Sequence, residues 1–129
     1  MKWMGPRTVL VVDDDARIVR MVCVKLERHG YRTLTASNGQ EALELMGQRA
    51  PDLLILDVMM PVMDGLDLVR ALKASPALRD IPIFILTARG QVADKELAYA
   101  LGIEEYIIKP FSPSAVLRRI NEYFAGLES

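Results

Sequence analysis

Short apolar runs recur along the chain, and each is followed by residues with helical spacing. Continuous apolar runs predict strands that are buried on both faces of a sheet. The predicted strands are Thr8–Val12, Tyr31–Ala36, Leu53–Leu56, Ile83–Leu86 and Glu105–Ile108. The first, third and fourth are apolar almost throughout, whereas the second alternates with polar residues and the fifth is short. This pattern predicts three inner strands and two edge strands.

A helix is expected after each strand, because apolar stripes and helix-ending residues occur there. Gly30 ends the first helix and Gly102 the fourth, which runs from about Val92 to Leu101. Asn38 caps the second helix, and Ser112 caps the fifth, with Pro113 at its first position. The second helix is expected at Gly39–Arg49. The third has an apolar stripe of Leu66, Val69 and Leu72 and ends at the Ser75-Pro76 break. The apolar stripe of the fifth consists of Val116, Leu117, Ile120 and Phe124.

This alternation of strand and helix predicts an α/β fold, a doubly wound five-stranded parallel sheet with five helices. Placing the two polar or short strands at the edges gives the strand order 2-1-3-4-5. Ligands of such sheets bind beyond the carboxyl ends of the strands, near the switch point between the first and third.

The composition fits one globular domain, because 51% of the 129 residues are hydrophobic and 26% are charged. We expect the domain to span residues 8–125, between short tails at 1–7, which include Trp3, and at 126–129. A net charge of -1 gives no indication of nucleic acid or membrane binding. The single cysteine, Cys23, lies on a helical stripe and excludes a disulfide framework, which fits a cytoplasmic location.

Polar side chains follow four of the strands, and all of them fall at one edge of the predicted sheet. Asp13 and Asp14 follow the first strand, Asp57 the third, Thr87 the fourth and Lys109 the fifth. Two carboxylates about 4 Å apart repel by roughly 4 kcal/mol at an effective dielectric of 20, so the cluster needs a counter-ion or raised pKa values. Oxygen ligands without histidine or thiolate select a hard ion such as Mg²⁺ rather than zinc or copper. Mn²⁺ is the expected substitute for Mg²⁺.

This set also suits phosphoryl transfer, for which a divalent cation and a lysine neutralise charge while a carboxylate acts as nucleophile. The single histidine, His29, ends a helix, where a partial positive charge is favourable, and we do not expect it to be a ligand.

The sequence resembles the receiver domains of bacterial two-component response regulators, the CheY-like superfamily. The segments that carry the resemblance are Val9–Asp15, Pro51–Asp57, Met60–Gly65, Ile83–Ala88 and Gly102–Phe111 with its Lys109-Pro110-Phe111. The resemblance covers nearly the whole chain. One departure is conservative: Gly102-Ile103-Glu104-Glu105 stands where the family often has Gly-Ala-Asp-Asp.

The resemblance implies a role for each of these positions. Asp57 would accept a phosphoryl group from a phosphohistidine on a sensor histidine kinase or histidine phosphotransfer protein. The implied Mg²⁺ ligands are Asp13, Asp14, Asp57 and the backbone carbonyl of Met59. The implied phosphoryl-binding and switch residues are Thr87, Ala88, Lys109 and Tyr106, of which Tyr106 would swing inward on activation. The Lys109–Pro110 peptide bond would be cis, and Met59 and Arg89 would tune the lifetime of the phosphorylated state.

Partners are implied in the same way. The surface made by the fourth helix, fifth strand and fifth helix would be read by a downstream protein or by an output domain. The domain would be a monomer or a phosphorylation-dependent dimer, and would itself bind neither nucleic acid nor membrane.

Two other functions compete with a receiver. Asp13-Asp14-Asp15 superficially fits the acid-x-acid motif of haloacid-dehalogenase-type phosphatases. That interpretation leaves Asp57 without a role and the chain without room for a cap domain. A phosphorylation-independent binding module with the same fold is the second alternative, and the intact acids, Thr87 and Lys109 argue against it.

Overall fold

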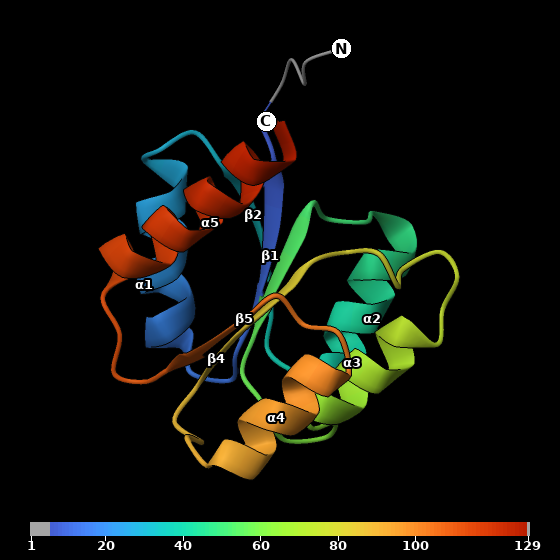
Figure 1. The fold of residues 1–129 in the computed structure, drawn as a ribbon. Coiled ribbons are helices and arrows are strands. Elements are labelled where there is room, and N and C mark those ends of the chain that lie inside the picture. Colours follow the sequence, from blue (N-terminus) through green and yellow to red (C-terminus); the bar gives the residue numbers. More distant parts are fainter. Residues whose placement is uncertain (1–5, 129) are drawn as a thin grey trace.

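The computed structural model describes residues 6–128, so Trp3 and the rest of residues 1–5, and residue 129, lie outside the described part. Figure 1 shows the strands side by side in the middle of the molecule, flanked by helices. The strands are β1 (Thr8–Val12), β2 (Arg32–Ala36), β3 (Leu53–Leu56), β4 (Ile83–Thr87) and β5 (Glu105–Ile108). The helices are α1 (Ala16–Glu27), α2 (Gly39–Gln48), α3 (Gly65–Lys73), α4 (Val92–Ala100) and α5 (Pro113–Glu128).

The five strands form one parallel sheet in the order β2-β1-β3-β4-β5, which confirms the predicted topology. The inner strands β1, β3 and β4 are buried along their whole length, whereas β2 has exposed residues at the edge. Burial on both faces explains the lack of alternation in the inner strands, since each residue faces a helix layer.

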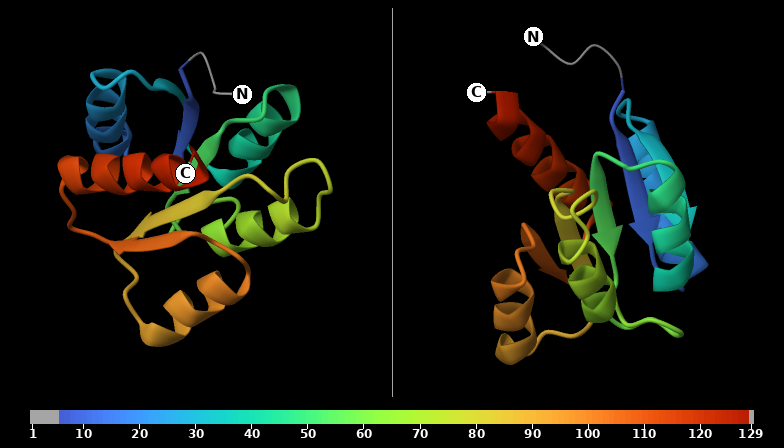
Figure 2. Two further views of the ribbon diagram at one scale, coloured as in Figure 1. Left: turned by 45° about the horizontal axis from the view of Figure 1, so that its top comes forward. Right: turned by 90° about the vertical axis from the view of Figure 1, so that its right-hand side faces the viewer.

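Two apolar clusters fill the space between the sheet and its helices, one on each face. Figure 2 shows the helices on both sides of the sheet in two further views. Residues of α1 and α5 pack on one face, where Cys23 is buried as expected. Residues of α2, α3 and α4 pack on the other. Within the described part of the chain, no helix is long and apolar enough to cross a bilayer.

Local signals set most helix limits. Asn38 accepts a hydrogen bond from the Glu41 amide at the start of α2, and Ser112 accepts one from Ala115 at the start of α5. Gly30 and Gly102 follow α1 and α4 with φ angles of +90° and +100°. This is the left-handed backbone conformation in which α-helices commonly end and which glycine adopts readily. The helix α5 continues through Glu128, so the domain end expected at residue 125 falls inside this helix.

Candidate functional site

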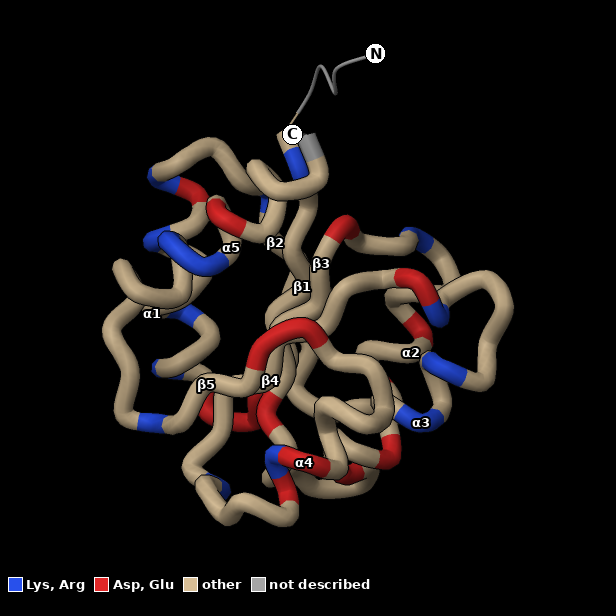
Figure 3. The backbone as a smooth tube through the Cα atoms, in the orientation of Figure 1, with Lys and Arg blue, Asp and Glu red and all other residues tan. Residues whose placement is uncertain are grey.

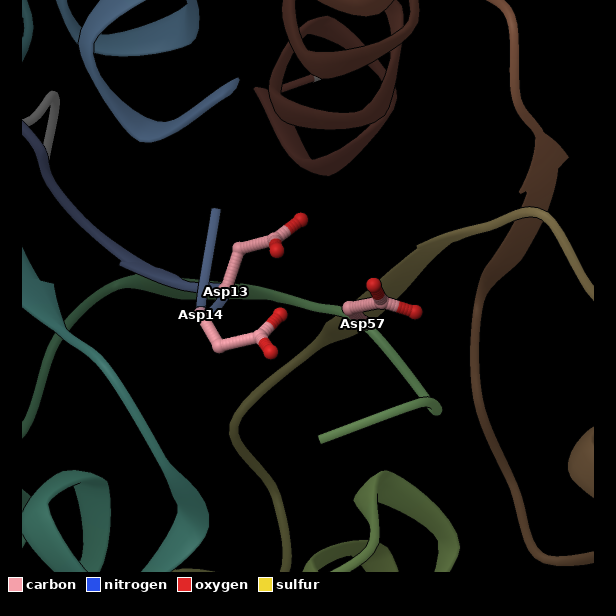
Figure 4. Close-up of side chains that lie close together, drawn as sticks. All are labelled: Asp13, Asp14 and Asp57. Atoms are coloured by element: carbon pink, nitrogen blue, oxygen red, sulfur yellow. The ribbon is translucent and has the colours of Figure 1, made fainter. Parts of the chain in front are cut away.

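Three carboxylates meet where β1 and β3 end. The parallel register pairs Val12 with Leu56, so the next residues, Asp13 and Asp57, emerge beside each other. Figure 4 shows Asp13, Asp14 and Asp57 close together, and one oxygen from each lies within 4.8 Å of the others. In Figure 3, further acidic positions lie in the lower part of the molecule, the end at which these strands finish. The side chains of Asp13 and Asp57 are buried, whereas Asp14 is exposed.

Backbone amides hold the two buried carboxylates in place. The Asp57 amide donates to the carbonyl of Val12 at 3.0 Å, which continues the sheet pairing by one residue. The Met59 amide donates to Asp57 Oδ1 at 3.0 Å, and the Asp15 amide donates to Asp13 Oδ1 at 2.9 Å. Each buried carboxylate therefore has one oxygen bound to the backbone and one that faces the cluster.

Lys109 supplies the positive charge of the site. Its Nζ lies 2.8 Å from Asp13 Oδ2 and 2.9 Å from Asp57 Oδ2. The Lys109 amide donates to the Thr87 carbonyl at 2.7 Å, which fixes the lysine next to the end of β4. The Lys109–Pro110 peptide bond is cis. One ammonium thus bridges the two buried acids.

Burial acts differently on the pKa values of Asp13 and Lys109. Burial raises the pKa of the Asp13 carboxyl above its ordinary value of 3.8, and the hydrogen bond from Lys109 offsets only part of that rise. Burial alone would lower the pKa of the Lys109 ammonium, but its hydrogen bonds to Asp13 and Asp57 outweigh burial, so its pKa is raised. Lys109 therefore stays charged, whereas burial makes the charged form of Asp13 less favourable. A further cation at this site would favour that charged form.

The residues after β4 connect this cluster to Tyr106. The Thr87 side chain is fully buried, and its Oγ1 accepts a hydrogen bond from the Arg89 amide at 3.2 Å. Tyr106 is 4% exposed, and its hydroxyl donates to the Arg89 carbonyl. Tyr106 is thus already inward in this structure, although the resemblance implies an inward movement only on activation. Apolar neighbours explain its burial, since the ring belongs to the apolar cluster of the α2–α4 face.

The Arg89 side chain, expected to tune the lifetime of the phosphorylated state, faces two acids other than Asp57. Its guanidinium lies 3.8 Å from an Asp64 oxygen and 4.0 Å from an Asp94 oxygen instead. Met59 is 52% exposed and lies two residues after Asp57, in the loop between β3 and α3.

Gly65 belongs to a segment that carries the resemblance, but no role beside Asp57 was predicted for it. A Cβ atom there would lie 2.4 Å from the Asp57 carbonyl oxygen, so only glycine lets α3 begin this close to the end of β3. The Asp64-Gly65 pair after the turn is the signal that could have identified it. The partnership of Arg89 with Asp64 and Asp94 has no comparable signal in the sequence.

Comparison with known proteins agrees with this geometry. Residues 9–121 match the family described as response regulator receiver domain. The chain belongs to this family. It is a receiver domain of the kind found in the response regulators of two-component signal transduction, as the resemblance implied.

Sequence relatives are regulators of transcription by name. The phosphate regulon transcriptional regulatory protein PhoB of Pseudomonas aeruginosa is 43% identical over 117 residues, which cover 91% of this chain and 51% of that protein. The alkaline phosphatase synthesis transcriptional regulatory protein PhoP of Bacillus subtilis is 42% identical over 114 residues, covering 88% of this chain and 47% of that protein. The chain therefore spans about half the length of these relatives.

Solved receiver structures share the fold. The chemotaxis response regulator CheY4 of Vibrio cholerae superposes with a TM-score of 0.85 at 34% identity, over 92% of this chain and 98% of that one. The N-terminal domain of a response regulator receiver protein from Methanoculleus marisnigri gives 0.75 at 41% identity, over 90% of this chain and 94% of that one.

Proposed function

We propose that Asp57 is the phosphoacceptor of this receiver domain and that its donor is a phosphohistidine of a sensor histidine kinase or histidine phosphotransfer protein. One observation carries the proposal: Asp57 directly follows the central strand β3, with Asp13, the residue after β1, beside it and Lys109 in contact with its Oδ2. In the transfer, an Asp57 oxygen forms a bond to phosphorus while the bond from phosphorus to the histidine nitrogen breaks. Lys109 offsets the charge that collects on the phosphoryl oxygens.

A divalent cation fits the acidic cluster, and we assign it as Mg²⁺, with Mn²⁺ as a substitute. The candidate ligands are oxygens only, from Asp13, Asp14, Asp57 and the Met59 carbonyl, and hard cations prefer such a set. The cluster carries three carboxylates against one ammonium, so a second positive charge is favourable there. When bound, the ion supplies charge neutralisation for the transfer.

We assign the switch to the residues after β4 and in β5. The phosphoryl group adds a charge of about -2, and we expect the Thr87 hydroxyl, the Ala88 amide and Lys109 to bind it. Movement of Thr87 would change its link to Arg89 and, through the Arg89 carbonyl, to Tyr106. A charge change of this size is enough to bias a two-state loop.

The α4–β5–α5 surface is our candidate for the face that partners read. It exposes large apolar side chains, among them Val92, Tyr99 and Ile108. Because the relatives that share half their length with this chain are regulators of transcription by name, we infer an output domain or a downstream protein as the partner. The domain would act in the cytoplasm as a monomer or a phosphorylation-dependent dimer.

The test is labelling by acetyl phosphate, read by intact-mass spectrometry. The parent should gain one phosphoryl group, and Asp57→Asn should gain none, because the amide keeps the size but is not a nucleophile. Asp67→Asn, which removes an exposed acid of α3, is the matched control and should label like the parent. Equal labelling of Asp57→Asn would refute the assignment. Sustained release of phosphate from esters, in place of stoichiometric labelling, would favour a phosphatase.

A further inference from the structure

Arg89 touches three parts of the site through three different groups. Its amide donates to Thr87 Oγ1, and its carbonyl accepts from the Tyr106 hydroxyl. Its guanidinium lies between Asp64 and Asp94, at 3.8 Å and 4.0 Å. One residue therefore contacts the phosphoryl-binding threonine, the switch tyrosine and the acids that begin two helices.

Both acidic partners of Arg89 are held by the helices they belong to. Asp64 caps α3 through Oδ1, which accepts from the Leu66 amide at 2.8 Å, so its Oδ2 is the oxygen that faces Arg89. Asp94 lies in the first turn of α4, where the helix dipole favours a carboxylate. The guanidinium therefore faces two carboxylates that lie at the starts of two helices, α3 and α4.

The groups of these ion pairs are partly buried. The side chains of Arg89, Asp64 and Asp94 are 34%, 36% and 23% exposed, so solvent screens them less than a fully exposed pair. The pairs do not by themselves bury the Tyr106 ring, which packs in the apolar cluster of the α2–α4 face. The ion pairs bear instead on the position of the Arg89 carbonyl, which accepts the hydrogen bond from the Tyr106 hydroxyl.

We propose that Arg89 is a positioning residue: its ion pairs with Asp64 and Asp94 hold the β4–α4 loop where the Arg89 carbonyl accepts from the Tyr106 hydroxyl, and this hydrogen bond adds to apolar packing in favouring the buried Tyr106 before phosphorylation. The proposal rests on the proposed function only in treating Tyr106 as the switch residue. Its consequence is a receiver that already populates the inward Tyr106 conformation at rest. Phosphorylation then increases the inward Tyr106 population by a smaller amount, because much of that population already exists and a ligand shifts an equilibrium only by its preference between the two states.

The test measures solvent access to tyrosine rings in the unphosphorylated protein. Ring signals of ¹³C-tyrosine are recorded with a soluble paramagnetic probe, and Tyr106→Phe assigns the Tyr106 signal. In Arg89→Gln we expect access to Tyr106 to rise about threefold, in keeping with the loss of two partly exposed ion pairs, while Tyr31 and Tyr123 stay unchanged. Asp64→Asn, whose amide still caps α3, and Asp94→Asn should each give part of that rise.

Two comparisons make the result specific. Arg70→Gln also removes an arginine from an ion pair, the exposed pair with Asp67 on α3, and should leave Tyr106 unchanged. The double variant of Arg89→Gln and Asp94→Asn should show no more access than Arg89→Gln alone, because the two changes remove the same contact. In about 1 M NaCl, where the Debye length is about 3 Å, the parent should move toward Arg89→Gln.

Unchanged access to Tyr106 in Arg89→Gln, or no effect of salt on the parent, would show that ring burial alone holds Tyr106 and would overturn the proposal. None of these measurements uses phosphorylation. Loss of Asp57 labelling and loss of Tyr106 positioning are therefore separate failures.

Discussion

The Nζ of Lys109 lies 2.9 Å from Oδ2 of Asp57, although 52 positions separate the two residues in the chain. The sheet brings them together, because β3 and β5 both end at the same edge with β4 between them. The same ammonium reaches Asp13, so the charge balance of the site depends on one side chain.

Replacing Lys109 with methionine should destabilise the metal-free protein by about 1–3 kcal/mol, because two buried carboxylates lose a charged hydrogen-bond partner. Mg²⁺ should restore most of that loss, since a cation at the acidic cluster replaces the missing charge. Urea unfolding with and without Mg²⁺ measures both effects, with Lys95→Met on the exposed face of α4 as the control. A loss of the same size with and without Mg²⁺ would contradict the prediction.

Asp13 should make stability depend on pH in a defined direction. Burial raises the pKa of its carboxyl in the folded protein, so the folded state binds this proton more tightly than the unfolded state does. Its contribution to stability is therefore greatest below the ordinary value of 3.8 and falls as the pH rises through the raised pKa. In metal-free buffer, Asp13→Asn should gain stability over the parent across that range. Asp67→Asn, an exposed acid, should show no such trend, and a parent that gains on Asp13→Asn with rising pH would disprove this direction.

The phosphorylated state should decay faster in Met59→Asn and in Arg89→Ala than in the parent. Met59 is apolar and exposed beside Asp57, so it cannot orient an attacking water, whereas asparagine can. The Arg89 guanidinium faces Asp64 and Asp94 in this structure, and we expect the added phosphoryl charge to draw it toward the site, so that its removal should admit water. We expect each rate to rise by a factor of about 2 to 10, or up to ~1.4 kcal/mol in the barrier. Decay is followed by intact mass after the phosphodonor is removed, and slower decay in Arg89→Ala would mean that the arginine assists hydrolysis.

Gly65→Ala should destabilise the domain by about 3 kcal/mol, because its Cβ would overlap the Asp57 carbonyl oxygen and the Val58 Cα. The overlap involves backbone, which cannot move aside as a flexible side chain would. Gly47→Ala is the matched control, since its Cβ in α2 would meet no atom within 4 Å and should add about 0.5–1 kcal/mol. Thermal and urea unfolding measure both variants, and a neutral Gly65→Ala would show that α3 can shift away from β3.

The sequence alone determined the architecture and the residues that gather at the site. Fully apolar strands are expected to be inner strands, and all strands of a parallel sheet end at one edge, so Asp13, Asp57 and Lys109 were expected to meet there. The positions of Gly30 and Gly102 were also readable, because left-handed helix ends require glycine locally. These features depend on short-range pattern and on the rules of sheet topology.

Only the tertiary structure decided the contacts of Arg89 and the burial of Tyr106. Arg89 pairs with Asp64, which is 25 positions earlier in a different loop. Nothing in the sequence distinguishes Asp64 from other acids near the site as the partner of Arg89. The close approach of Gly65 to the Asp57 carbonyl likewise follows from how α3 packs against β3. Long, flexible side chains take their partners from the distances between packed elements, and neither periodicity nor local propensity encodes those distances.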